Sequence, residues 1–185
     1  MPLNSRTLAL ASTFVAVGAV TRVVLGNIAL ESPVPLYGVI IKTGLTETLT
    51  ITNGIACGPL AGFLTGSLII VVSDLFMIPG PWTPFIAAII GLLGFLAGMA
   101  RGWVKNPKAL NLAALAVPLT VLSEFLQNSW VSLFYNFPVL VTMISGLPAL
   151  VTALINNLIL MTTAGPRIVR LIQAVTKNAS VPSSS

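Results

Sequence analysis

The sequence predicts an all-α integral membrane protein with six transmembrane helices, and three observations support that class. Of its 185 residues, 56% are hydrophobic and only 7% are charged, which is too apolar for a soluble domain. Apolar runs of roughly 20 residues recur, the length that crosses a bilayer as a helix. On an alternating path, seven of the nine basic residues fall on one side, which the positive-inside rule makes cytoplasmic, together with both termini. These seven are Arg6, Arg101, Lys105, Lys108, Arg167, Arg170 and Lys177.

The first third of the chain predicts one clear span and one weak helix. The first helix covers 7–25, which is nearly all apolar. Residues 26–46 are typical of a loop, because Pro33 and Pro35 disfavour a helix. The stretch 47–57 is too short to cross the membrane alone, so we expect a poorly formed second helix there.

The other expected spans begin or end at proline, glycine or arginine, where a helix has a physical reason to start or stop. They cover 59–78, 85–100, 110–134 and 146–165. A proline-rich turn at 79–84 is expected to be rigid, and 135–145 is a hydrophobic outer loop or a bent start of the last span. Residues 1–177 are therefore expected to form a single six-helix membrane domain, and 178–185 a disordered polar tail.

The residue types exclude several classes of function. The chain has no histidine and one cysteine, Cys57, which argues against histidine catalysis, disulfide frameworks and most zinc or haem sites. No P-loop motif occurs, and the basic residues form no stripe suited to nucleic acid. We therefore expect no catalytic residues, no metal and no cofactor.

Small residues recur every four positions on three spans, where they allow helix backbones to approach closely. Two glycine stripes are expected to pack within the protein, with contact to another subunit as the alternative. They are Gly58, Gly62 and Gly66, and Gly94, Gly98 and Gly102. A looser stripe on the first span, Ser12 and Ala16, is expected to dock a partner.

Polar side chains within the spans gather toward one depth, which is costly in a membrane unless they serve a function. Those between 124 and 135 share one helical face, and two asparagines of the last span lie near the midplane. We expect the cluster to line a ligand pocket, whereas hydrogen bonding between helices is the alternative for any single member. The expected ligand-binding residues are Glu124, Gln127, Asn128, Asn156, Asn157, Trp82, Asp74 and Tyr135.

Three of the residues near the outer surface have more specific expected roles. Asp74 closes the outer end of the third span. Trp82, on the proline-rich turn above the expected pocket, can stack on a flat ligand. Arg22 is expected to extend to the interface or to pair with Glu31 or Glu124.

Three stretches of the sequence follow the plan of a known family. N-G-I-A-C-G-P-L-A-G-F-L-T-G at 53–66 runs into Ser73 and Asp74, and P-G-P-W-T-P occupies 79–84. The last expected span contains P-A-L-V-T-A-L-I-N-N at 148–157. On these motifs and the six-span layout, the chain resembles the substrate-binding S components of energy-coupling factor (ECF) vitamin transporters.

The resemblance implies a subunit that binds one vitamin or precursor from outside and catalyses nothing. It implies a transmembrane coupling subunit and two cytoplasmic ATPase subunits as partners. The family docks its coupling subunit through small residues of the first helix, often A-x-x-x-A, where this chain has Ser12 and Ala16. The family's ligand lies under loops that correspond to 26–46, 78–84 and 135–145.

Riboflavin is the first ligand that we expect, because the pattern is nearest to riboflavin-type members and a flat ring suits stacking on Trp82. Thiamine, pantothenate, biotin, folate and queuosine precursors stay open. A stand-alone secondary transporter or channel is an alternative function. An intramembrane enzyme with Glu124 and Asp74 as acid and base is another. In each case the protein is a multi-pass protein of the cell membrane, in contact with lipid.

Overall fold

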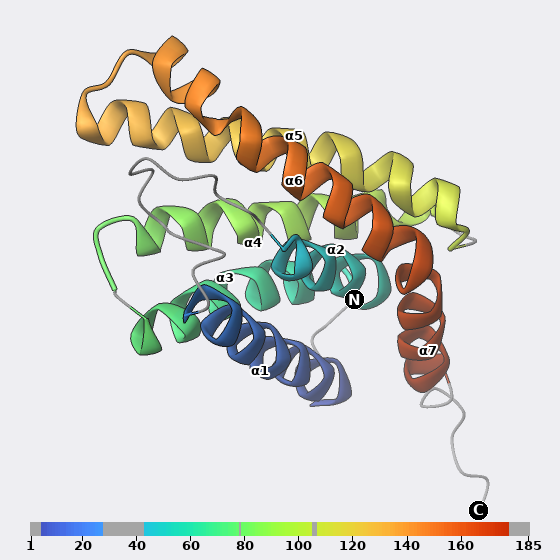
Figure 1. Ribbon diagram of the computed structural model, residues 1–185. Coiled ribbons are helices and arrows are strands. Elements are labelled where there is room, and N and C mark those ends of the chain that lie inside the picture. The colour runs from blue at the N-terminus through green and yellow to red at the C-terminus, as the bar shows by residue number, and fades with distance from the viewer. Residues whose placement is uncertain (1–4, 28–42, 78, 105–106, 178–185) are drawn as a thin grey trace, which may run out of the picture.

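Figure 1 shows a computed structural model of the protein, which describes residues 5–27, 43–77, 79–104 and 107–177. All regular structure in these residues is helical, which confirms the predicted all-α class. The helices are α1 (Ser5–Asn27), α2 (Leu45–Cys57), α3 (Pro59–Phe76), α4 (Thr83–Met99), the 3-10 helix η1 (Ala100–Gly102), α5 (Ala109–Tyr135), α6 (Val139–Thr163) and α7 (Gly165–Lys177). The expected tail at 178–185 and most of the expected loop at 26–46 lie outside the described residues.

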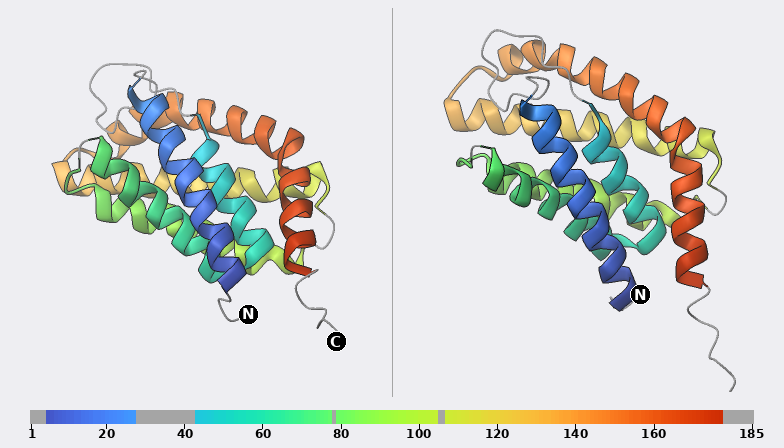
Figure 2. Two further views of the ribbon diagram at one scale, coloured as in Figure 1. Left: turned by 90° about the horizontal axis from the view of Figure 1, so that it is seen from below. Right: turned by 60° about the horizontal axis from the view of Figure 1, so that its bottom comes forward.

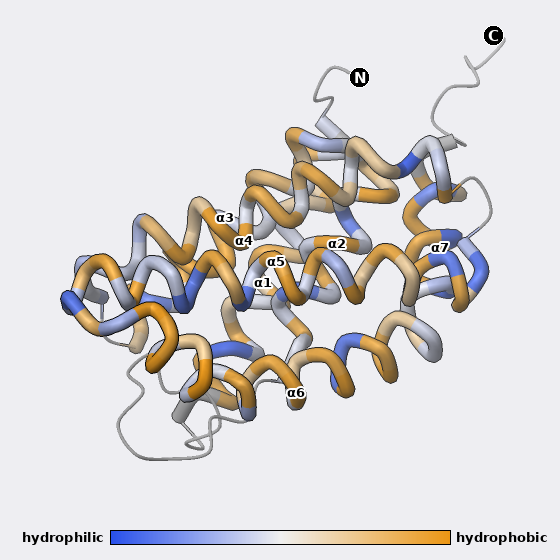
Figure 3. Tube along the Cα trace, turned by 90° about the horizontal axis from the view of Figure 1, so that it is seen from above, coloured by the Kyte–Doolittle hydropathy of each residue, from blue (hydrophilic) through white to orange (hydrophobic). Residues whose placement is uncertain are grey.

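Five of the described helices, α1, α3, α4, α5 and α6, are long and apolar enough to cross a membrane. In Figure 3 these helices are mostly hydrophobic, with hydrophilic positions gathered toward the ends of the molecule and on α7, and a few in the middle. The helices therefore support the predicted multi-pass membrane protein.

α2 is a regular helix of thirteen residues at the centre of the bundle, so the expectation of a poorly formed helix at 47–57 is wrong. Every residue from Glu47 to Ile55 is buried, because the other helices pack around it (Figure 1). Gly44 and Gly58 bound the helix with φ angles of 67° and 104°, which glycine adopts without strain.

The last part of the chain also differs from the expected layout. α6 begins at Val139, so of the two alternatives for 135–145 the early start of the last span is observed and the outer loop is wrong. Pro138 directly precedes the helix and suits a helix start because it lacks the N–H that would have no partner there. The helix α7 follows α6 and is buried through Val169 and Ile172, which are 0% and 4% exposed. Amphipathic packing of this kind explains a further helix that begins at Gly165 and Pro166, where we expected the last span to end.

The two ends of the molecule differ in charge, and Figure 2 shows which helices begin and end at each. α1 begins, and α2 and α7 end, at the same end of the molecule. We call this the basic end, because it carries the following described basic residues: Arg101, Lys108, Arg167 and Arg170. At the opposite end α3 and α5 terminate and α4 and α6 begin; we call it the Trp82 end after the residue that precedes α4.

Glycines let α2, α3 and α4 pack with their backbones in contact. A Cβ atom on Gly94 would meet the carbonyl oxygen of Gly62, and a Cβ on Gly62 would meet that of Gly94, closer than atoms can approach. Gly98 lies equally close to the backbone of Pro59, whereas a Cβ on Gly102 would meet nothing within 4 Å. The predicted packing of the glycine stripes within the protein is thus confirmed at these positions except Gly102.

Candidate ligand-binding site

Asn157 lies at the centre of a buried hydrogen-bond network that joins α2, α5 and α6. Its Nδ2 donates to Glu47 Oε2 at 2.9 Å and to Thr120 Oγ1 at 2.8 Å. The hydroxyl of Thr48 donates to Asn157 Oδ1 at 2.9 Å. All four side chains are at most 5% exposed. Both hydrogens and the oxygen of the Asn157 amide are therefore engaged, and we call these four residues the Asn157 network.

The start of α2 is built around this asparagine. Gly44 has a left-handed backbone, and a Cβ atom there would lie 2.6 Å from Asn157 Oδ1, so only glycine fits without displacing the amide. Glu47 lies in the first turn of α2, where the helix dipole favours a carboxylate. Thr120 lies about 16 Å along α5 at ~1.5 Å per residue. The network is therefore in the middle of the bundle.

A row of polar side chains continues from this network along one face of α5. We call it the polar row, and its members are Thr120, Ser123, Glu124, Gln127 and Asn128. Their spacing of three and four positions places them on one side of a helix over roughly 12 Å. Ser123 and Glu124 are 0% and 3% exposed, so the row faces the interior of the bundle.

Hydrogen bonds within α5 hold the half of the polar row that is nearer the Trp82 end. Gln127 Nε2 donates to Ser123 Oγ at 2.9 Å, and Asn128 Nδ2 donates to the Glu124 carbonyl oxygen at 2.8 Å. A Cβ atom on Gly146 of α6 would lie 2.5 Å from Asn128 Nδ2. The absence of a side chain at Gly146 thus leaves room for Asn128 between α5 and α6.

The structure therefore brings Glu124, Gln127, Asn128 and Asn157 of the expected site to one face of α5 and its contact with α6. Asn156 is half-buried and, one position from Asn157, points roughly 100° away around α6. Sequence reasoning missed Glu47, whose signal was an acidic residue within a threonine-rich segment that we expected to be poorly ordered.

Tyr135 belongs to an aromatic cluster at the Trp82 end. Its ring contacts Trp130, Phe134 and Phe137 at centroid distances of 6.3, 5.1 and 6.2 Å. Phe85 of α4 joins the cluster through Trp130, at 5.2 Å. The cluster begins two positions beyond Asn128 and connects the end of α5 to the start of α4. Tyr135 therefore lies beyond Asn128, the member of the polar row that is nearest the Trp82 end.

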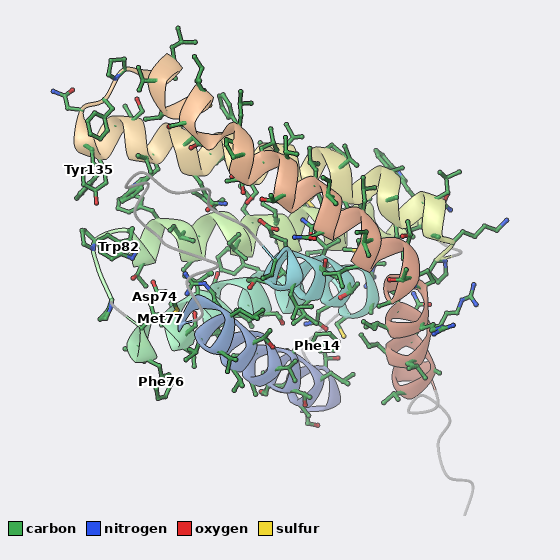
Figure 4. All side chains as sticks on the ribbon, in the orientation of Figure 1. Phe14, Asp74, Phe76, Met77, Trp82 and Tyr135 are labelled. Carbon is green, nitrogen blue, oxygen red and sulfur yellow. The ribbon has the colours of Figure 1, made fainter. Side chains whose placement is uncertain are left out.

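Asp74 is held by residues of α1, α3 and α4. Arg22 of α1 forms an ion pair with Asp74 Oδ1 and donates to Ser73 Oγ at 2.5 Å. Thr83 Oγ1 donates to Asp74 Oδ2 at 2.6 Å. The expectation that Arg22 pairs with Glu124 is thus wrong, because the Arg22 guanidinium binds Asp74. The other expected partner, Glu31, lies outside the described residues. Figure 4 places Asp74 and Met77 at the end of α3, with Trp82 and Tyr135 at the same end of the molecule.

The stripe expected to dock a partner is exposed. Ser12 and Ala16 both lie on the outer side of α1, whereas Ala11 and Ala19 are each 4% exposed. A Cβ on Gly18 would meet the side chain of Ile69, which identifies α3 as the neighbour of the buried side. Ser12 and Ala16 are thus not used for packing within the described bundle.

No group of three or more histidine, cysteine or acidic side chains that suits a metal ion is found within 5–27, 43–77, 79–104 and 107–177. The side chains of the described site offer hydrogen bonding by amides and hydroxyls, acceptance by carboxylates and contact with aromatic rings.

Comparison with known proteins yields a partial match. A "UPF0397 protein" of Streptococcus gordonii is 27% identical over 89 residues, which is 48% of this chain. The match covers 45% of that relative, so the chain spans less than half the length of the curated relative it matches. No protein-family profile matches the sequence, and no solved structure matches it. The likeness is thus to part of that protein and assigns neither a ligand nor an activity.

Proposed function

We propose that the chain is the substrate-binding S component of an ECF-type importer, which binds one vitamin or vitamin precursor tightly and catalyses nothing. The observation that carries this proposal is the polar row of α5, which continues from the buried Asn157 network along a helix long and apolar enough to cross a membrane. Polar groups at such depth are expensive in a bilayer and commonly mark a solute site. The sequence resemblance at 53–66, 79–84 and 148–157 supports the same function.

The proposed membrane topology has six crossings and both termini in the cytoplasm of a cell membrane. Five long helices and the return of α2 toward the basic end support it. The basic residues of that end favour the cytoplasmic side, because positive charge is retained there during insertion. The Trp82 end then faces outward, and the polar row lies between it and the middle of the bundle. A subunit that takes up a ligand from outside requires this orientation.

The ligand that we propose is riboflavin, and the other vitamins named above are its competitors. An isoalloxazine ring offers a flat face to Trp82 and several acceptors and donors to amide side chains such as Gln127 and Asn128. The direct test is mass spectrometry of small molecules released from protein purified in detergent, together with riboflavin titration of the ligand-free protein. Recovery of another vitamin would replace the ligand and keep the function. Accumulation of solute by vesicles that contain this chain alone would instead support a secondary transporter.

Replacing the polar row should weaken ligand binding. Glu124→Ala is expected to lower affinity by about tenfold or more, because a hydrogen bond to a charged group contributes ~1.5–3 kcal/mol. Asn128→Ala is expected to lower affinity by several-fold, because a bond between neutral groups contributes ~0.5–1.5 kcal/mol. The measurement is titration of the co-purifying vitamin by isothermal calorimetry. Thr162→Ala is the control, since its exposed hydroxyl bonds only to carbonyl oxygens of its own helix in the described contacts. Unchanged affinity in both row variants would place the ligand elsewhere.

The proposed partners are a transmembrane coupling subunit and two cytoplasmic ATPase subunits, with α1 as the docking helix. Ser12→Leu with Ala16→Leu should abolish co-purification of the coupling subunit, because large side chains prevent close approach of two backbones. Ligand affinity should stay unchanged, since both residues lie on the exposed face of α1. The matched control is Ala88→Leu with Ala114→Leu, two exposed alanines on α4 and α5. Assembly that survives the α1 change would exclude this docking face.

A further inference from the structure

The Trp82 turn is tied to α3 by a chain of hydrogen bonds. Gly80 N–H donates to Thr83 Oγ1 at 3.2 Å, and Thr83 N–H donates to the Gly80 carbonyl oxygen at 3.0 Å. The same Thr83 hydroxyl donates its proton to Asp74 Oδ2 at 2.6 Å. One threonine therefore links the turn to a carboxylate that is 2% exposed.

Arg22 completes this chain from the side of α1. It binds Asp74 Oδ1, so the two oxygens of the carboxylate serve α1 and the turn separately. The Arg22 side chain is only 10% exposed. A charged pair that is largely removed from water and held by further hydrogen bonds fixes orientation more firmly than an exposed pair does.

The indole of Trp82 lies over the turn that these bonds hold. A Cβ atom on Gly80 would be 2.6 Å from Cε2 of Trp82, so the ring lies directly against the Gly80 backbone. The indole nitrogen Nε1 is buried and has no hydrogen-bond acceptor among the residues that the structure describes. A buried N–H without an acceptor is costly, and a ligand that supplies an acceptor removes that cost.

We infer that Asp74 is a positioning residue, which acts through Thr83 and Gly80 to hold the Trp82 indole so that its N–H donates to an acceptor on the ligand. The contact between Trp82 and a ligand rests on the proposed function, whereas the positioning of Trp82 by Asp74 does not. It replaces the expected direct contact of Asp74 with the ligand, because both carboxylate oxygens already have partners. It also specifies the ligand as one that presents a carbonyl oxygen or ring nitrogen in the plane of the indole, and this contact takes the place of stacking on the face of Trp82.

The test compares Thr83→Val with Thr83→Ser in a protein whose other tryptophans, Trp103 and Trp130, are changed to phenylalanine. Valine keeps the shape of threonine and removes the hydroxyl, whereas serine keeps the hydroxyl. The first measurement is acrylamide quenching of Trp82 fluorescence in ligand-free protein. We expect the quenching constant to rise at least about twofold in the valine variant only, because losing a hydrogen bond to a carboxylate shifts the turn toward open forms by roughly tenfold.

The second measurement is riboflavin affinity, which should fall about tenfold in the valine variant and stay unchanged in the serine variant. Equal quenching in both variants, or unchanged quenching in both, overturns the positioning. Raised quenching with unchanged affinity overturns the role of Trp82 toward the ligand. If the unmodified protein binds no riboflavin, the proposed ligand fails, and the quenching result still decides the positioning. Arg22→Gln and Arg22→Lys are a second pair with the same expected contrast if Thr83→Val does not fold.

Discussion

Asn157→Leu is expected to lower the free energy of unfolding by about 3 kcal/mol or more, because it removes hydrogen bonds from several buried polar groups at once. Glu47 loses a donor, and the hydroxyls of Thr48 and Thr120 lose an acceptor and a donor. Each buried group left unsatisfied costs ~1–3 kcal/mol, and more when it is charged. For a chain of this size such a loss corresponds to a fall in melting temperature of roughly 6–12 °C.

The measurement is thermal unfolding in detergent, followed by circular dichroism at a helix wavelength. Asn156→Leu is the matched control, because it makes the same change one position away at a half-buried site. It should lower the melting temperature much less. Equal melting temperatures for the two variants would mean that the Asn157 network contributes little to stability, and that water or side-chain rearrangement replaces its bonds.

Gly94→Ala is the second change with a large expected effect, although it adds only a methyl group. That methyl would meet the carbonyl group of Gly62, which belongs to the backbone of α3 and cannot rotate away. Overpacking of a tight interior costs ~1–3 kcal/mol, occasionally more, and a clash with backbone belongs at the upper limit. We therefore expect a loss of about 3 kcal/mol, with separation of α4 from α2 and α3.

Gly102→Ala provides the comparison, since it continues the same four-residue stripe but has open space around its added methyl group. It should be neutral or slightly stabilising, because alanine loses less backbone entropy than glycine on folding. Melting curves of the two variants in one detergent decide the matter. A Gly102 variant as unstable as the Gly94 variant would contradict the proposed backbone contact and indicate a general need for small residues along the stripe.

The sequence was sufficient for the helical membrane class because that class depends on the length and composition of single segments. Apolar runs with proline or glycine at their limits identify α1, α3, α4 and α5 closely. The same reasoning did not predict α2 as a regular helix. A helix buried on every side has no polar face and therefore no amphipathic period, and thirteen residues are too few to be recognised as a span.

The partners of the site residues were beyond reach of the sequence for a different reason. Glu47 and Asn157 are 110 positions apart, and Arg22 and Asp74 are 52 apart. Helical spacing predicts which residues of one helix share a face, as it did for Glu124 and Asn128. It contains nothing about which face of which other helix lies opposite, since that depends on side-chain packing throughout the bundle.

The short length of α2 has a consequence for how the protein is made. Thirteen residues that include Glu47 cannot enter the lipid as a stable span while the ribosome is still extending the chain. The segment is joined to α3 through Gly58 alone, so we expect it to stay at the membrane surface or beside the insertion machinery until the glycine surfaces of α3 and α4 are in place. On the proposed topology we therefore expect a late step in biogenesis, in which α2 moves into a bundle already formed by the longer helices. A defect in that step would yield a protein whose long helices are all inserted but whose Asn157 network has not formed.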